Sequence, residues 1–355
     1  DHLIDTGWNA DALTRYVATL AGLGQIHPTD ETYSFCNTGY GVAGRLLEVA
    51  TGEHFDRVLR RRLTRPLGCR ATLTLPQHAL LHSVAVGHAQ VPGGEPVRQG
   101  RWVLTRSNGP MGGVMAPADE LLAFARLHLA AGRAPDGVDL LSPAAVEAMQ
   151  EPHVESPLPG EDQALGWTVR RWGNLTCLGQ DADTFGQRAL LRVVPERGFA
   201  VCVMANSPMG GPLGQALIDR VAADLLDVSA DSLDLPVAGD PAAPVGSAPP
   251  AASTDLARHE GVFERLHQRI EVTADETGGG RLRLTIEPSG VLKALGVGDA
   301  RLDMTPLGDD PASGRQLFTG TDPASGEREL AVFTPPSDAQ PPGLYLSGRL
   351  HRRAA

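Results

Sequence analysis

The sequence has 355 residues, of which 42% are apolar and 21% are charged, and its formal net charge is −11. This length allows one large domain and a small one. The acidic balance argues against a nucleic-acid partner, which needs a basic face. No apolar run approaches the ~20 residues of a membrane-spanning helix.

The first part of the chain shows helical periodicity. Within residues 10–22, Leu13, Tyr16, Val17 and Leu20 recur at the spacing of one helix face. A second helix is predicted from Asn37 or Thr38, either of which is suited to cap its N-terminus, to a stop at Gly52. The apolar residues expected on its inner face are Tyr40, Ala43, Leu46 and Leu47.

The middle of the chain changes from helices to strands and back. Amphipathic spacing predicts helices at 116–132 and from Ser142, which is a suitable N-cap before Pro143. Strand-like runs then occupy 165–172, 188–195 and 199–206, and a closing helix is expected at 211–228. Helices followed by an antiparallel sheet and a closing helix are typical of an α+β fold.

A change of composition separates the tail from the rest. Residues 229–254 are rich in Pro, Ala, Ser and Gly, which predicts a linker. Beyond it, alternating apolar and polar residues predict short strands at "RIEVTAD", "RLRLTIE", "RELAVFTP" and "LYLSGRL". Residues 255–355 are therefore expected to form a small all-β barrel or sandwich. Its interior is either packed or holds a modest apolar ligand, and packing is favoured at this size.

The run "PTDETYSFCNTGYGVAGRLLEVATG" (28–52) resembles the serine β-lactamase and penicillin-binding-protein-like hydrolases, in their class C lactamase and esterase branch. The resemblance continues through 109–132 and 165–207, and the tail is similar to the lipocalin-like module of many actinobacterial members. It implies a β-lactamase/transpeptidase-like α+β domain in residues 1–228, incomplete at its N-terminus. It also implies a lipocalin-like barrel in residues 255–355.

The resemblance also implies a mechanism, acyl transfer through a serine. In the family, a Ser-x-x-Lys turn supplies the nucleophile and a proton acceptor. A Tyr-x-Asn motif shares the acid–base work and orients the substrate. A Lys-Thr-Gly or His-x-Gly strand flanks the pocket, and backbone N–H groups form the oxyanion hole. No cofactor is implied.

The first of these motifs is absent from the sequence. Lys293 is the only lysine, and the residue three positions before it is Gly290. In the family the motif precedes Tyr-x-Asn, so here it would lie upstream of Asp1. The opening "DHLIDTGWNA" lacks Met and shows no basic or apolar region of a signal peptide. Either an upstream segment carries the serine and the lysine, which the opening without Met favours, or the gene product has no nucleophile.

The second motif is present with one substitution, as Phe35-Cys36-Asn37. Asn37 matches the family asparagine, whereas Phe35 stands in place of the tyrosine and has no hydroxyl to exchange a proton. Tyr33 would point to the same side of an extended segment, about 6.6 Å away by strand rise. We place Tyr33 among the substrate-binding residues, but not as a replacement for the lost hydroxyl.

The third motif is also altered. Gln180 stands where the family has His or Lys, so the position keeps a hydrogen-bonding group and loses a positive charge. Asp181, Ala182 and Asp183 follow it on the strand edge along which substrate would lie. Side chains in place of the family glycines would narrow the groove. We expect these three residues to contact substrate.

No metal site is predicted, because the histidines form no H-E-x-x-H pattern and the four cysteines no C-x-x-C pair. Two functions then remain open. One is a serine hydrolase or acyltransferase relative, acting on an ester, amide or peptide, whose degraded motifs make residues 1–355 weak or inactive. The other is a pseudoenzyme that binds a small molecule or peptide in the groove without chemistry.

Overall fold

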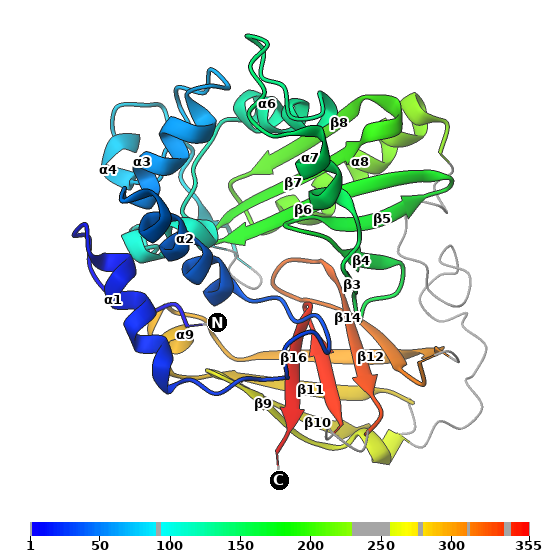
Figure 1. Ribbon diagram of the computed structural model, residues 1–355. Helices are drawn as coiled ribbons and strands as arrows, with labels where there is room; N and C mark the ends of the chain where they lie inside the picture. The colour runs from blue at the N-terminus through cyan, green and yellow to red at the C-terminus, as the bar shows by residue number, and fades with distance from the viewer. Residues whose placement is uncertain are drawn as a thin grey trace.

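The computed structural model of the chain describes residues 2–89, 94–228, 256–275, 280–310, 313–336 and 342–354. It forms two modules, a helical and six-stranded-sheet module and a closed barrel (Figure 1). This arrangement confirms the predicted α+β domain followed by an all-β barrel. The whole of the predicted linker, residues 229–254, lies outside the described residues.

Nine α-helices are described, several of them short. The longer ones confirm the predicted helices, including that at Ser142, whose hydroxyl accepts the N–H of Ala145 at 3.1 Å. The bounds are α1 Ala12–Ala18, α2 Asn37–Thr51, α3 Phe55–Leu59, α4 Pro76–Ala79, α5 Gly109–Gly112, α6 Ala118–Leu129, α7 Pro143–Gln150, α8 Gly210–Leu226 and α9 Gly290–Ala294.

The packing of α2 differs from the prediction. Cys36, not Asn37 or Thr38, is the N-cap residue, and the expected apolar inner face is wrong, since Leu46 is 64% exposed. The buried positions of the helix are Gly41, Gly44 and Glu48. Glycines permit α1 and α5 to approach closely, because a Cβ on Gly44 would lie 2.8 Å from Cβ of Pro110. The apolar periodicity of α2 therefore does not mark its contact face.

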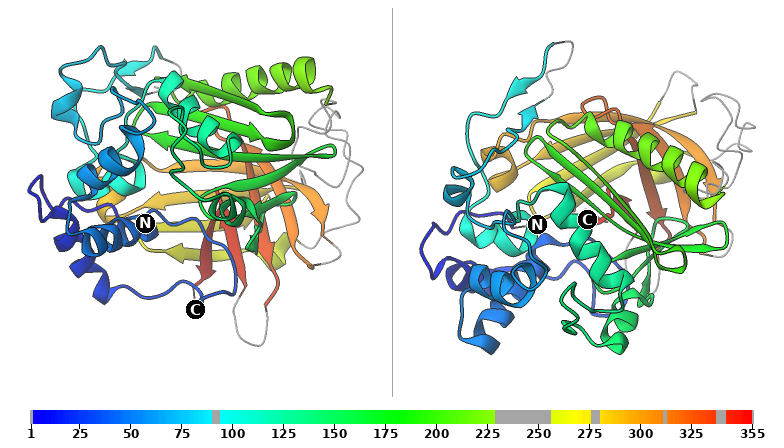
Figure 2. Two further views of the ribbon diagram at one scale, coloured as in Figure 1. Left: turned by 45° about the horizontal axis from the view of Figure 1, so that its top comes forward. Right: turned by 90° about the horizontal axis from the view of Figure 1, so that it is seen from above.

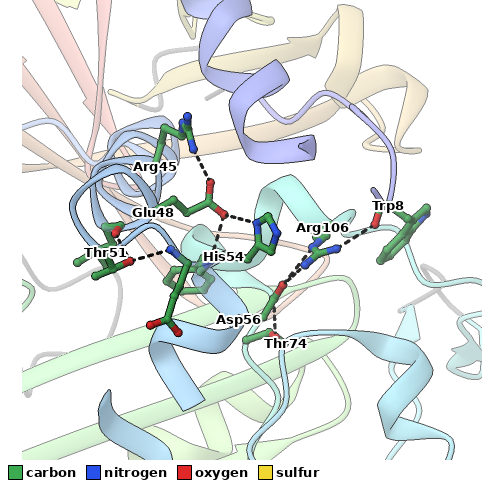
Figure 3. Close-up of polar contacts among 11 residues, drawn as sticks. Trp8, Arg45, Glu48, Thr51, His54, Asp56, Thr74 and Arg106 are labelled. Atoms are coloured by element: carbon green, nitrogen blue, oxygen red, sulfur yellow. Dashed lines mark hydrogen bonds and ion pairs between the residues drawn. The ribbon is translucent and has the colours of Figure 1, made fainter. Parts of the chain in front are cut away.

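A polar network fixes the segment after α2. Glu48 is 7% exposed, and its carboxylate accepts hydrogen bonds from Arg45 Nη1 and from the Phe55 N–H, both at 3.0 Å (Figure 3). Beyond it, Asp56 pairs with Nη2 of Arg106 at 2.7 Å. These charge-assisted contacts satisfy the buried Glu48 and the partly buried Asp56, and they connect α2, α3 and the 3-10 turn before α5.

The sheet of the first module is antiparallel, in the order β3-β4-β5-β6-β7-β8. Its strands are β3 Val154–Glu155, β4 Glu161–Gln163, β5 Thr168–Trp172, β6 Leu175–Thr184, β7 Gln187–Val194 and β8 Phe199–Ala205. Apolar residues of α8 pack on one face and residues of α6 on the other (Figure 2). A separate two-stranded pair joins β1 His88–Ala89 to β2 Val97–Arg98.

The barrel closes through eight antiparallel strands, β9 to β16, with β16 paired to β9. Their bounds are β9 Gly261–Arg265, β10 Gln268–Ala274, β11 Leu282–Pro288, β12 Ala300–Asp309, β13 Gln316–Thr321, β14 Arg328–Thr334, β15 Gly343–Leu346 and β16 Arg349–Arg353. Inward residues such as Phe263, Leu284 and Phe333 form a buried apolar cluster. The run "LYLSGRL", predicted as one strand, is a hairpin that turns at Ser347 and Gly348.

Among the described residues, no helix is both long enough and apolar enough to cross a membrane.

Candidate active site

The segment that carries the Tyr-x-Asn-like motif lies against the hairpin of β15 and β16. The Phe35 N–H donates to the Gly348 carbonyl at 2.9 Å. The Leu350 N–H donates to the Ser34 hydroxyl at 3.1 Å. These bonds hold the extended chain before α2 along the barrel, so the barrel forms one wall beside the motif.

Arg349 is the side chain that this hairpin brings to the motif. Its guanidinium carbon lies 4.5 Å from the centre of the Phe35 ring, a cation–π contact. Burial lowers the pKa of Arg349, while nearby Tyr33, Cys36 and Asp183 act to raise it. The structure therefore gathers residues of the second and third motifs around one guanidinium that sequence analysis did not identify.

Asn37 begins α2 with a partly buried side chain, directly after the exposed Cys36. Tyr33 precedes it on the extended segment. Burial, followed by the effects of Tyr40 and Glu161, raises the pKa of Tyr33 to about 12. Its hydroxyl thus keeps its proton at neutral pH and is suited to donate a hydrogen bond rather than to accept a proton.

Gln180 lies exposed on β6, opposite Leu191 of β7. Its amide nitrogen donates to the Asp181 carbonyl at 3.3 Å. Strand alternation puts Ala182 on the same face as Gln180, and puts Asp181 and Asp183 on the other. The four adjacent residues therefore do not line one surface.

Asp181 forms an ion pair with Arg192, whose side chain is only 3% exposed, whereas the Asp181 side chain is 42% exposed. The Asp181 Oδ2 lies 3.0 Å from Arg192 Nη2, which also donates to Gln215 of α8 at 3.0 Å. Burial, the largest single effect, lowers the pKa of Arg192, but Asp181, Cys177 and Glu161 together raise it, so the net shift is upward. Asp181 thus neutralises a cation between the sheet and α8.

The open end of the barrel holds a cavity of about 160 Å³. Its polar lining includes Arg265, Gln268, Asp322, Glu329, Ser347 and Arg349. Its apolar lining is Ile286, Ala300, Leu302 and Leu346. Sequence analysis missed these polar residues, because alternation on a strand does not reveal which end of a barrel faces another module. The single usable signal was the Ser-Gly turn in "LYLSGRL", which favours a hairpin.

Comparison with known proteins gives matches in both modules. The family described as Beta-lactamase matches residues 3–226. Penicillin-binding protein 4 of Amycolatopsis lactamdurans is 38% identical over 212 residues, 58% of this chain and 55% of that protein. Unguisins hydrolase ungD' of Aspergillus campestris is 27% identical over 216 residues, 58% of this chain and 39% of that protein. The matched part of the chain thus spans about half or less of the length of these relatives.

Solved structures extend the likeness to the barrel. A structure of SurE matches with a TM-score of 0.68 and 27% identity, covering 99% of this chain and 76% of SurE. The octameric penicillin-binding protein homologue from Pyrococcus abyssi matches with a TM-score of 0.57 and 16% identity, covering 99% and 71%. At 16% identity, the likeness to the Pyrococcus abyssi protein concerns the fold alone. With the family match covering more than half of the sequence, the chain belongs to the Beta-lactamase family.

Proposed function

We propose that this chain provides the substrate-binding side of a serine-dependent acyl-transfer site that acts on an ester, amide or peptide. The observation that carries the proposal is the docking of the barrel hairpin on Ser34 and Phe35, directly before Asn37, with Arg349 stacked over the Phe35 ring. A hairpin bound to the motif segment builds a composite groove, as a site for an extended substrate requires. One of the matched relatives is named a hydrolase.

In the proposed reaction, a serine attacks the carbonyl carbon, the leaving group departs with a proton, and water or an amine then releases the acyl group. Asn37 would bind the substrate amide at the start of α2. Gln180 would donate a hydrogen bond from β6 without the charge of the family residue. The serine and its lysine would come from polypeptide beyond residues 1–355.

Two apolar surfaces support such an additional segment. On α2, Leu46 is 64% exposed and Val49 is 66% exposed. On α8, Leu213 is 63% exposed and Leu217, one turn later, is 47% exposed. Large aliphatic side chains clustered on a helix face favour burial against another element. A segment that carries Ser-x-x-Lys would cover them and place the nucleophile beside Asn37.

A binding module without chemistry is the second candidate, and one observation favours it. Phe35 occupies the position of the family hydroxyl, and a cation–π contact covers its ring. Covalent labelling of the complete gene product with a fluorophosphonate separates the two. One adduct on a serine of a Ser-x-x-Lys motif supports acyl transfer. No adduct, under conditions that label an intact relative, leaves ligand binding.

A further inference from the structure

A tight turn of the barrel, between β13 and β14, presents one glutamate to the sheet of the first module. The Asp322 carboxylate accepts the Ala324 N–H at 2.8 Å and the Ser325 hydroxyl at 3.0 Å. The Gly326 N–H donates to the Asp322 carbonyl at 2.8 Å, in a left-handed conformation (φ +71°) that suits glycine. Because these bonds close the turn on itself, Glu327, the residue that follows it, is held in a defined position.

Glu327 forms an ion pair with Arg188, which lies near the start of β7 in the sheet of the first module. The side chains of Arg188 and Glu327 are 14% and 28% exposed, so solvent screens this pair less than it screens a surface pair. The start of α8 also approaches the pair, because a Cβ on Gly211 would lie 2.8 Å from Cδ of Glu327. The carboxylate of Glu327 is therefore enclosed between β7 and α8.

Arg188 also connects the barrel to the strand of the third motif. Its Nη1 lies 3.4 Å from Oδ2 of Asp183, the residue opposite it on β6. The Asp183 side chain is 57% exposed, so the pair between modules is the more buried of the two that Arg188 forms. The guanidinium of Arg188 thus bridges one carboxylate of the sheet and one carboxylate of the barrel.

A continuous series of contacts leads from this ion pair to the second motif. Two residues after Glu327, on β14, the Glu329 carboxylate accepts the Ser347 hydroxyl at 3.0 Å. Ser347 begins the turn between β15 and β16, and Arg349, two residues later, lies 4.5 Å from the centre of the Phe35 ring. The barrel is therefore bound to the third-motif strand at one point and to the second-motif segment at another, with β14 and the hairpin between them.

We propose that Arg188 is a positioning residue of the acyl-transfer site, which acts through Glu327 to hold the barrel hairpin on the motif segment. This inference rests on the proposed function, because the groove that the hairpin borders is the proposed substrate groove. The ion pair fixes how far the hairpin stands from the C-terminal end of β6, and so sets the width of the groove. An acyl chain that extends along the hairpin depends on this width, whereas a short acyl group does not.

The first test measures the docking of the hairpin and requires no turnover. Hydrogen–deuterium exchange of the complete gene product is followed by mass spectrometry at single-residue resolution. Its reporters are the Phe35 and Leu350 N–H groups, which donate across the modules to Gly348 and Ser34. Arg188→Gln should speed the exchange of both reporters by about tenfold, because it removes one contact that opposes local opening. Amides within β7 and β11 should exchange as in wild type.

Matched variants separate the ion pair from general destabilisation. Glu327→Gln should speed exchange as much as Arg188→Gln, and the double variant should exchange no faster than either, because all three lose the same interaction. Arg188→Lys should keep most of the protection. Glu155→Gln is the control and should match wild type, since Glu155 pairs with Arg315 between the same modules but is 69% exposed.

The second test is kinetic and compares two esters that share a leaving group. The acyl group of p-nitrophenyl acetate is short, whereas that of p-nitrophenyl 6-acetamidohexanoate can extend along the groove. Arg188→Gln should raise KM for the long ester by about threefold or more, with little change in kcat. Both constants for the acetate should stay near their wild-type values, and Arg188→Lys should restore KM for the long ester.

The outcomes distinguish failure of this inference from failure of the proposed function. Unchanged exchange at Phe35 and Leu350 in Arg188→Gln overturns the inference alone. Equal acceleration at the reporters and within β7 and β11 also overturns it, because Arg188 would then support only the stability of the whole fold. Equal effects on the two esters overturn the role in setting the groove. A complete gene product that turns over neither ester overturns the proposed function, and the role of Arg188 in acyl transfer with it.

Discussion

The guanidinium of Arg349, from the last hairpin of the barrel, lies 4.5 Å from the ring centre of Phe35, the altered residue of the Tyr-x-Asn-like motif. The two residues are 314 positions apart in sequence and belong to different modules. Their contact means that the barrel is part of the candidate site rather than a separate appendage. It also means that the altered residue has a defined partner, which connects the substitution to the structure around it.

Restoring the tyrosine is not expected to restore hydrolysis. Phe35→Tyr supplies a hydroxyl, but Gln180 still lacks the charge of the family residue, and Arg349 still covers the ring. We expect ester turnover by the complete gene product to change by less than about threefold, given that several groups act together in such sites. Turnover of a chromogenic ester measures this. A clear gain of ester turnover in the Phe35→Tyr variant contradicts the account. A gain that appears only in the double variant, Phe35→Tyr with Gln180→His, agrees with it.

Asp181 is expected to matter for stability. Asp181→Asn leaves the buried Arg192 without its carboxylate, and because the Asp181 side chain is 42% exposed and screened by solvent, we expect a loss of about 1–2 kcal/mol. Urea unfolding should show this loss. Asp183→Asn is the matched change on the same face of β6, where the carboxylate is 57% exposed, and it should alter stability by under about 1 kcal/mol. Equal stability of the two variants would argue against the ion pair.

The glycine face of α2 gives a test of helix packing. Gly44→Ala places a methyl group 2.8 Å from Cβ of Pro110, so α5 must shift. We expect a loss of about 1–3 kcal/mol in the free energy of unfolding. Gly39→Ala in the same helix meets nothing within 4 Å, and it should be neutral or stabilising by up to about 1 kcal/mol. A tolerated Gly44→Ala with a costly Gly39→Ala would reverse the assignment of the buried face.

The stability of the fold should fall below neutral pH, in part through His128. Its ring packs against Phe124 and Trp167, and burial lowers its pKa to about 4. The unfolded chain takes up this proton near pH 6.5 and the folded chain only near 4. The contribution of His128 is therefore complete above 6.5 and is lost as the pH falls toward 4, by up to roughly 3 kcal/mol.

Urea unfolding at pH 7 and pH 5 measures this dependence. His128→Phe should keep the aromatic packing and reduce the loss of stability between the two values. His78→Gln, at an exposed histidine of α4, should leave the loss unchanged. An unchanged loss in His128→Phe would show that other groups, such as the buried His259 and His351, account for the acid sensitivity.

Much of the fold could be predicted from the sequence because its signals are local. The Ser142 cap and the alternation of Leu282, Leu284 and Ile286 depend on neighbouring residues, and the structure confirms both. The inner face of α2 could not be found in this way. Its contacts depend on what lies opposite, and small residues such as Gly44 carry no apolar signal.

The candidate site was predicted only in part, for a related reason. Phe35, Asn37 and Gln180 occupy motif positions that a family resemblance can identify. Arg349 is a charged residue in a strand whose periodicity indicates only a barrel. Its position over the Phe35 ring depends on a contact between modules, which neither composition nor spacing encodes. Asp181 illustrates the converse, since a residue beside the third motif also forms an ion pair with Arg192 of the neighbouring strand β7.

The most direct test of the account is intact-protein mass spectrometry after incubation with a fluorophosphonate, applied to the complete gene product and to residues 1–355 in parallel. We predict one covalent adduct on the complete product, mapped by peptide sequencing to a serine followed three residues later by lysine, and none on residues 1–355. An intact family relative serves as the labelling control. An unlabelled complete product beside a labelled control would contradict acyl transfer and leave a binding module in its place.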